Sequence, residues 1–200
     1  MQLGNPTLTI EDVIEVARHG RAVPHLDPTT PAYQRILASR RWVEQVLASN
    51  DRAYYGINTG FGIKAGRVPL ETAEIPWLSR NLIVSHASGV GPSFHPEVVR
   101  AAMLLRAHSL AQGYSGVRPQ LIETLVQMLN EGVTPLVPEL GSVGSSGDLA
   151  PLSHLALVIS ERPTTHPERA LPPNLPSDYD ESGRALVLLH EGKRPHTSSR

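Results

Sequence analysis

Residues 141–148, Gly-Ser-Val-Gly-Ser-Ser-Gly-Asp, form a glycine- and serine-rich stretch directly before an apolar run that begins at Leu149. In many proteins a glycine-rich loop at the start of a helix binds a ligand, or adopts a backbone conformation that other residues disfavour. The residues that flank the glycines decide which chemistry such a loop can support, and here they exclude several common loop types.

Phosphate-binding loops require residues that this stretch lacks. In a P-loop a lysine and a serine or threonine follow the last glycine, whereas here Gly147 is followed by Asp148, whose charge would repel phosphate. A dinucleotide-binding loop follows a strand, but residues 134–140 contain two prolines, and an esterase elbow needs a glycine where Asp148 stands. Composition alone therefore favours a flexible loop whose Asp148 caps the following helix.

A second glycine-rich segment, residues 54–62, reads Tyr-Tyr-Gly-Ile-Asn-Thr-Gly-Phe-Gly. It places three aromatic side chains among three glycines, in a chain that has only 4% Phe, Trp and Tyr. Loops of this composition often line a pocket, and they also occur as purely structural loops whose tyrosines pack. Taken alone, the segment leaves both interpretations open.

Three segments in colinear order resemble the aromatic amino acid ammonia-lyases, and specifically histidine ammonia-lyase: residues 54–62, residues 81–91 (NLIVSHASGVG) and residues 141–154 (GSVGSSGDLAPLSH). The resemblance runs from Arg52 to Ser160, and the intervening RAHSLAQGYSGVRPQ is also similar to the family. The resemblance covers only the N-terminal portion of the family's proteins. The resemblance implies a mainly α fold of long packed helices, in a homotetramer whose active sites combine several subunits.

The resemblance also implies an internally formed prosthetic group, methylidene-imidazolone (MIO), made from Ser145, Ser146 and Gly147 without an external cofactor. In the family the glycine nitrogen attacks the carbonyl carbon of the first residue and water is lost, after which the middle serine loses its hydroxyl. Glycine permits the strained backbone that this closure requires. The resulting alkene is an electrophile that acts as an electron sink during elimination of ammonia. Asp148 either assists the cyclisation or caps the next helix.

Two further roles follow from the resemblance. Tyr55 would be the general base, although a phenol with a reference pKa of about 10 is a poor base near neutral pH unless its anion is stabilised. His86 would contact the substrate ring, as in the members that convert L-histidine to trans-urocanate and ammonia. The alternatives are an ammonia-lyase or aminomutase acting on tyrosine or phenylalanine, and a non-catalytic truncated remnant.

Periodicity predicts the helices that must position these segments. Apolar residues at helical spacing, with capping residues or prolines at the start and glycines at several ends, indicate six helices. They are expected at residues 9–20 with Thr9 as the N-cap, at 30–51, from about Glu71 to about His86 with an interruption near Pro76, at 95–113, at 118–132 and after Asp148. Strand signals are few.

Composition excludes several classes of function. Eighteen Lys and Arg residues against 19 Asp and Glu residues give a formal charge of -1, which argues against nucleic acid or an anionic membrane as a partner. Cysteine is absent, so no thiol can be a nucleophile or ligand. His95, His108 and His154 lack the spacing of a metal site, and we expect no metal. Neither a signal peptide nor a membrane span is recognisable, so we expect a cytoplasmic protein.

The chain divides in composition near residue 160. Residues 1–160 form the region that resembles the lyases, whereas residues 161–200 hold six of the 18 prolines and only 184–190 could form a regular element. The family's later asparagine-containing segment has no counterpart in this tail, and in Ser145 the chain departs from the family's usual alanine. We expect a truncated or frame-shifted product or one part of a split enzyme, impaired or inactive alone and dependent on homo-oligomerisation or a separate C-terminal chain.

Overall fold

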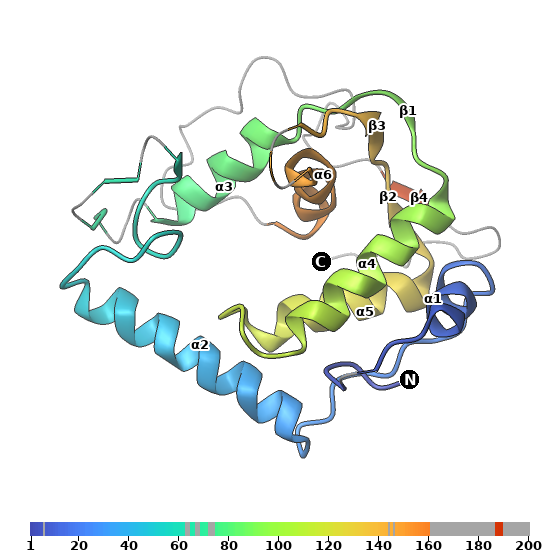
Figure 1. Ribbon diagram of the computed structural model, residues 1–200, viewed down its shortest axis with the longest axis horizontal. Helices are drawn as coiled ribbons and strands as arrows, with labels where there is room; N and C mark the ends of the chain where they lie inside the picture. The colour runs from blue at the N-terminus through green and yellow to red at the C-terminus, as the bar shows by residue number, and fades with distance from the viewer. Residues whose placement is uncertain are drawn as a thin grey trace, which may run out of the picture.

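The computed structural model describes residues 1–5, 7–62, 65–66, 69–71, 75–143, 145, 147–160 and 187–189. The described residues are mainly helical, as predicted (Figure 1). The helices are α1 (Ile10–Ala17), α2 (Pro31–Ser49), α3 (Ile75–His86), α4 (Pro96–Leu110), α5 (Pro119–Glu131) and α6 (Leu149–Ile159). The strands are β1 (Val90–Ser93), β2 (Val133–Pro135), β3 (Pro138–Leu140) and β4 (Val187–Leu189).

The helix ends follow local sequence signals. Thr9 caps α1 through a reciprocal capping box: its hydroxyl accepts the Asp12 N–H at 3.1 Å, and the Asp12 carboxylate accepts the Thr9 N–H. Gly132 ends α5 in the left-handed conformation with φ 72°, which glycine adopts without a steric penalty. α3 begins at Ile75, so Pro76 lies in its first turn, where a missing N–H costs nothing. Residues 72–74 lie outside the described residues, so the predicted start near Glu71 with an interruption near Pro76 stays a prediction.

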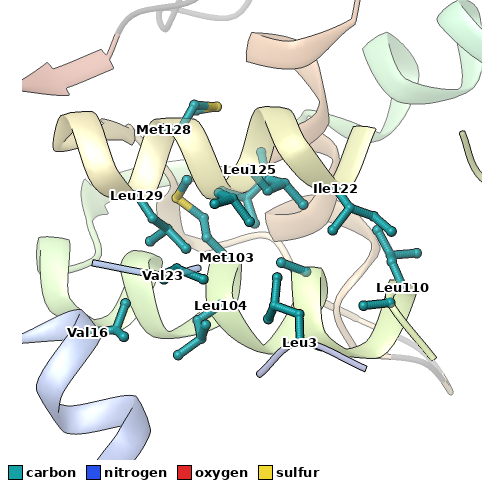
Figure 2. Packing of buried hydrophobic residues seen from close by; sticks show 14 of the residues in the cluster. Leu3, Val16, Val23, Met103, Leu104, Leu110, Ile122, Leu125, Met128 and Leu129 are labelled. Carbon is teal, nitrogen blue, oxygen red and sulfur yellow. The ribbon is translucent and has the colours of Figure 1, made fainter. Parts of the chain in front are cut away.

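The hydrophobic core lies between α4 and α5, with α1 packed against α4 (Figures 1 and 2). Figure 2 shows side chains of α4 and α5 pointing toward one another, joined by Leu3, Val16 and Val23 from the N-terminal segments. Several core side chains of α4 and α5 are 0% exposed, among them Met103, Leu104, Ala107, Ile122 and Val126. Burial of this apolar surface is the main favourable term that holds the three helices together.

Two small antiparallel sheets connect segments that are far apart in the sequence. β1 pairs with β3, and β2 pairs with β4, so that Val133 lies opposite Leu189. β4 falls within residues 184–190, the one part of the tail in which the sequence predicted an element. The rest of residues 161–200 lies outside the described residues, and the division of the chain at residue 160 stays a prediction.

The segment after α4 holds α2 in place. The Arg35 Nε donates to the Gln112 carbonyl at 3.1 Å, and the Gly116 N–H donates to the Ser39 hydroxyl at 2.9 Å. A Cβ atom on Gly113 would lie 2.6 Å from the Arg35 Cβ, so the two backbones approach as closely as glycine allows. Because residues 51–62 follow α2 directly, this contact also sets the position of the second glycine-rich loop.

Arg100, on α4, is 3% exposed, and its guanidinium joins three helices. It donates to the carbonyls of Val16 (2.9 Å) and Ala17 (3.2 Å) at the end of α1, and to that of Leu129 (3.1 Å) near the end of α5. Burial lowers the pKa of the guanidinium from its usual value. Carbonyls at helix C-termini lack partners within their helix and carry partial negative charge, so they suit a buried cation.

We expect replacement of Arg100 by methionine to lower the free energy of unfolding by about 3 kcal/mol, because buried carbonyls lose charged donors. Arg100→Lys should recover only part of this loss, since an ammonium group cannot span all of these acceptors. Urea unfolding followed by circular dichroism measures both effects. The control is Arg18→Gln, which removes the exposed Arg18–Glu97 ion pair (3.0 Å) and should cost less than about 1 kcal/mol. Equal losses for Arg100→Met and Arg18→Gln would contradict this role.

Candidate active site

The packing of α3 against α6 brings two of the predicted site segments to neighbouring element ends (Figure 1). His86 is the last residue of α3, and Ser145 and Gly147 lie just before α6 begins at Leu149. Ser145 and Gly147 are both exposed. Ser146, the central residue of the predicted prosthetic group, lies outside the described residues.

The start of the loop is fixed by its contact with the segment after His86. β1 pairs with β3, which places Val90 opposite Leu140. A Cβ atom on Gly141, whose φ is 151°, would lie 2.9 Å from the Gly89 Cα. No side chain therefore fits between these two backbone segments. The loop therefore leaves β3 in direct contact with the segment that follows His86.

Gly147 has the conformation that only glycine adopts readily. Its φ is 74°, and apart from its chain neighbours no described residue would lie within 4 Å of a Cβ atom built on it. The constraint at Gly147 is thus conformational and not steric, which is what a loop needs if its glycine nitrogen is to approach a preceding carbonyl. The conformation of Gly147 is compatible with a prosthetic group of the predicted kind.

Asp148 stands at the N-cap of α6, but its side chain makes no capping hydrogen bond, so the predicted side-chain cap was wrong. An N-cap side chain accepts from the second or third helical N–H, and the third residue of α6 is Pro151, which has no N–H to give. The carboxylate instead lies 3.7 Å from the Arg106 guanidinium on α4.

The His86 ring is oriented by its own helix. Its Nδ1 lies 2.9 Å from the Leu82 carbonyl and 3.1 Å from the Ser85 hydroxyl, which itself donates to the Leu82 carbonyl at 3.0 Å. Because a carbonyl oxygen can only accept, the contact requires the proton on Nδ1. In the neutral ring Nε2 then presents a lone pair, so His86 can accept a hydrogen bond from a ligand N–H.

The contacts of Tyr55 lie within its own loop. Its side chain is 66% exposed, its hydroxyl accepts the Gly62 N–H at 3.2 Å, and its ring meets Phe61 edge to face at 5.8 Å. In the part of the chain that the structure describes, Tyr55 makes no hydrogen bond or ring contact with His86 or Ser145. The structure brings the segments of His86 and Ser145 to neighbouring element ends, and among the described residues it shows no such contact for Tyr55.

Asn58 organises the loop that carries Tyr55, a role that the sequence did not predict. It is fully buried, its amide donates to the Asn50 Oδ1 (2.8 Å) and the Arg52 carbonyl (2.9 Å), and its Oδ1 accepts the Tyr54 N–H at 2.7 Å. An asparagine among closely spaced glycines is the available signal, because asparagine side chains commonly bond to nearby backbone in turns.

An apolar groove of about 450 Å³ lies beside the loop, between α4 and α6. Its walls are mostly aliphatic, and Arg106 and Asp148 supply its charged groups. Val98 and Leu105, two turns apart on α4, are each 51% exposed in it. Among the described residues no three His, Asp or Glu side chains could together hold a metal ion, and no described helix is long and apolar enough to cross a membrane.

Comparison with known proteins decides the family. The model of the aromatic amino acid lyase family matches residues 8–172, which extends beyond the segment in which the motifs were recognised. The chain belongs to the aromatic amino acid lyase family. It is 50% identical to histidine ammonia-lyase 2 of Fusobacterium nucleatum over 157 residues, which cover 78% of this chain and 30% of that protein.

Solved lyase-family structures share the fold. The tyrosine aminomutase of Streptomyces globisporus matches with a TM-score of 0.69 and 37% identity over 80% of this chain and 29% of that one. A histidine ammonia-lyase from Trypanosoma cruzi matches with a TM-score of 0.67 and 33% identity, over 78% of this chain and 29% of that one. The chain spans about 30% of the length of the curated lyases that it matches.

We expect Asn58→Asp to destabilise the chain by about 2 kcal/mol or more, because a buried carboxylate would replace two donors and face two acceptors. Thermal unfolding measures the effect as a lower midpoint. Asn5→Asp is the matched control, since it makes the same change in charge at an exposed asparagine and should leave the midpoint nearly unchanged. If the two variants melt together, Asn58 does not organise the loop.

Proposed function

We propose that this chain is the N-terminal portion of a histidine ammonia-lyase, which eliminates ammonia from L-histidine and gives trans-urocanate. The identity of about 50% with histidine ammonia-lyases over more than 150 residues carries the proposal. The tyrosine aminomutase structure, at 37% identity, is less similar in sequence. The chain spans less than a third of these relatives, so it is inactive or impaired without the remainder.

Ser145, Ser146 and Gly147 supply the atoms of the methylidene-imidazolone group, with no external cofactor. The Gly147 nitrogen bonds to the Ser145 carbonyl carbon as one water leaves, and Ser146 loses its β-hydroxyl and an α-proton as a second water. The positive φ of Gly147 supports this assignment. The group, once formed, supplies an electrophile that draws electrons from the substrate and so weakens its bond to nitrogen. Ser145 adds only a hydroxyl beside the ring.

His86 recognises the substrate side chain. With the proton held on Nδ1 by the Leu82 carbonyl, its Nε2 accepts a hydrogen bond from the imidazole N–H of histidine. Its place at the end of α3, next to α6 and the Ser145 loop, supports a substrate that lies between the two elements.

Tyr55 acts as the base that removes a proton from the substrate, in a site completed by another subunit. A shared site is supported by its contacts, which lie within its own loop, and by its exposed ring, which is free to face a neighbouring copy. The apolar groove between α4 and α6 supports packing against the remainder of the enzyme, because exposed side chains such as Val98 and Leu105 are stabilised when covered. The assembly is a homotetramer, or a complex with a separate C-terminal chain.

The second candidate is a tyrosine or phenylalanine ammonia-lyase or aminomutase. The solved tyrosine aminomutase and a phenylalanine aminomutase of Pantoea agglomerans share this fold, at 37% and 32% identity. Both candidates require the ring from residues 145–147, and they differ in the side chain that His86 meets. A non-catalytic remnant is the third possibility, and it requires an unmodified Ser145-Ser146-Gly147.

Ring formation is tested by the mass of the peptide that contains residues 141–148, in chain co-expressed with the C-terminal remainder of the Fusobacterium nucleatum relative. We expect the parent sequence and Ser145→Ala to be lighter by two water molecules, because the side chain at 145 takes no part in closure. The matched Ser146→Ala variant lacks the β-hydroxyl and should not show the two-water deficit. An unmodified parent peptide would refute the proposal and favour the remnant.

Substrate choice is tested in a chimera in which residues 1–160 replace the corresponding part of that relative. We expect turnover of histidine above that of tyrosine or phenylalanine, followed by the absorbance of each product. His86→Leu should raise the KM for histidine about tenfold through loss of one hydrogen bond, and His86→Gln should retain part of the affinity through its acceptor oxygen. Faster turnover of tyrosine than of histidine would favour the second candidate.

A further inference from the structure

His154 connects α6 to the segment that follows His86. Its side chain is 2% exposed, and its Nε2 lies 3.1 Å from the main-chain nitrogen of Gly89. A main-chain N–H can only donate, so Nε2 is the acceptor, and in the neutral ring the proton sits on Nδ1. This hydrogen bond joins residues that are 65 positions apart in the sequence.

Neighbouring atoms lie close to this hydrogen bond at the two positions where glycine has no side chain. A Cβ atom on Gly89 would lie 2.9 Å from the His154 Nε2 and 3.0 Å from the Pro138 Cβ. A Cβ atom on Gly141 would in turn lie 2.9 Å from the Gly89 Cα and 3.5 Å from the Ala150 Cβ. The imidazole, the Gly89 backbone and the Gly141 backbone thus form one continuous stack, which we call the His154 clamp.

The clamp connects both halves of the candidate site. Gly89 follows His86 by three residues, and Gly141 precedes Ser145 by four. His154 belongs to α6, the helix that the Ser145 loop enters. A shift of the Gly89 segment would therefore change the distance between His86 and the loop, and it would release Gly141 at the same time.

We propose that His154 is a positioning residue, which holds the segment after His86 against the start of the prosthetic loop by accepting the Gly89 N–H. It touches neither substrate nor the reacting atoms. Its effect on ring closure, though not the clamp itself, rests on the proposed function. Closure requires that the loop be held in one compact conformation, and the clamp supplies a fixed point at its N-terminal end.

The proposal is tested by hydrogen exchange of main-chain amides, measured by mass spectrometry on the 200-residue chain. His154→Leu removes the acceptor at similar volume, and we expect exchange in residues 87–93 and 138–143 to rise together about tenfold. His154→Gln offers an oxygen acceptor and should restore exchange to within about threefold of the parent. The control is His108→Leu, which removes a half-buried histidine from α4 and should leave both segments unchanged.

Three results would overturn the clamp: no rise in His154→Leu, the same rise in His108→Leu, or a uniform rise that includes the amides of α4 and α5. The uniform rise would mean that His154 contributes only general stability. If His154→Leu fails to fold, Gly89→Ala disrupts the same contact from the other side, and it should raise exchange in residues 138–143 while α5 stays protected.

The mass of the peptide containing residues 141–148 gives an independent readout in the same variants, in chain co-expressed with the C-terminal remainder. We expect ring formation to be slowed in His154→Leu and restored in His154→Gln. Ring formation at the parent rate in His154→Leu would overturn the link between the clamp and closure. If the parent itself stays unmodified, the proposed function fails, and the exchange experiment still decides whether the clamp exists.

Discussion

The burial of α4 is the constraint on which the rest of the described structure depends. α1 and α5 enclose its apolar side, so that Met103 and Leu104 have no exposed surface. The segments that leave its two ends then have little freedom. β1 directly precedes α4 in the sequence. Residues 112–116 follow α4 and bind α2 through hydrogen bonds, and α2 is followed by the loop that contains Tyr55. Both parts of the candidate site are therefore positioned by opposite ends of α4.

Much of this architecture could be predicted because its signals are local. Thr9 and Thr30 mark helix starts, Gly132 marks an end, and apolar residues at helical spacing mark the buried faces. The motif segments were recognised because they are long and lie in colinear order. Local signals fail where two of them compete: Asp148 is a favourable N-cap residue, but Pro151 removes one of the donors that such a cap needs.

The contacts that tie the site together were not predictable, because each joins residues whose proximity depends on the completed fold. Nothing near His154 in the sequence indicates that its ring meets Gly89, and nothing near Arg106 indicates Asp148. Asn58 is an intermediate case, since its partners lie within eight residues but depend on a turn that several glycine-rich sequences could form.

The three carbonyl partners of Arg100 have a consequence for the behaviour of the protein in acid. Carboxylates lose their charge when protonated, so surface ion pairs in general weaken as the pH falls. Main-chain carbonyls do not titrate in that range, and within the described residues all the hydrogen bonds of Arg100 end on such carbonyls. The junction of α1, α4 and α5 thus keeps its polar contacts at a pH where surface ion pairs are lost, and acid should loosen the periphery of the molecule before its centre.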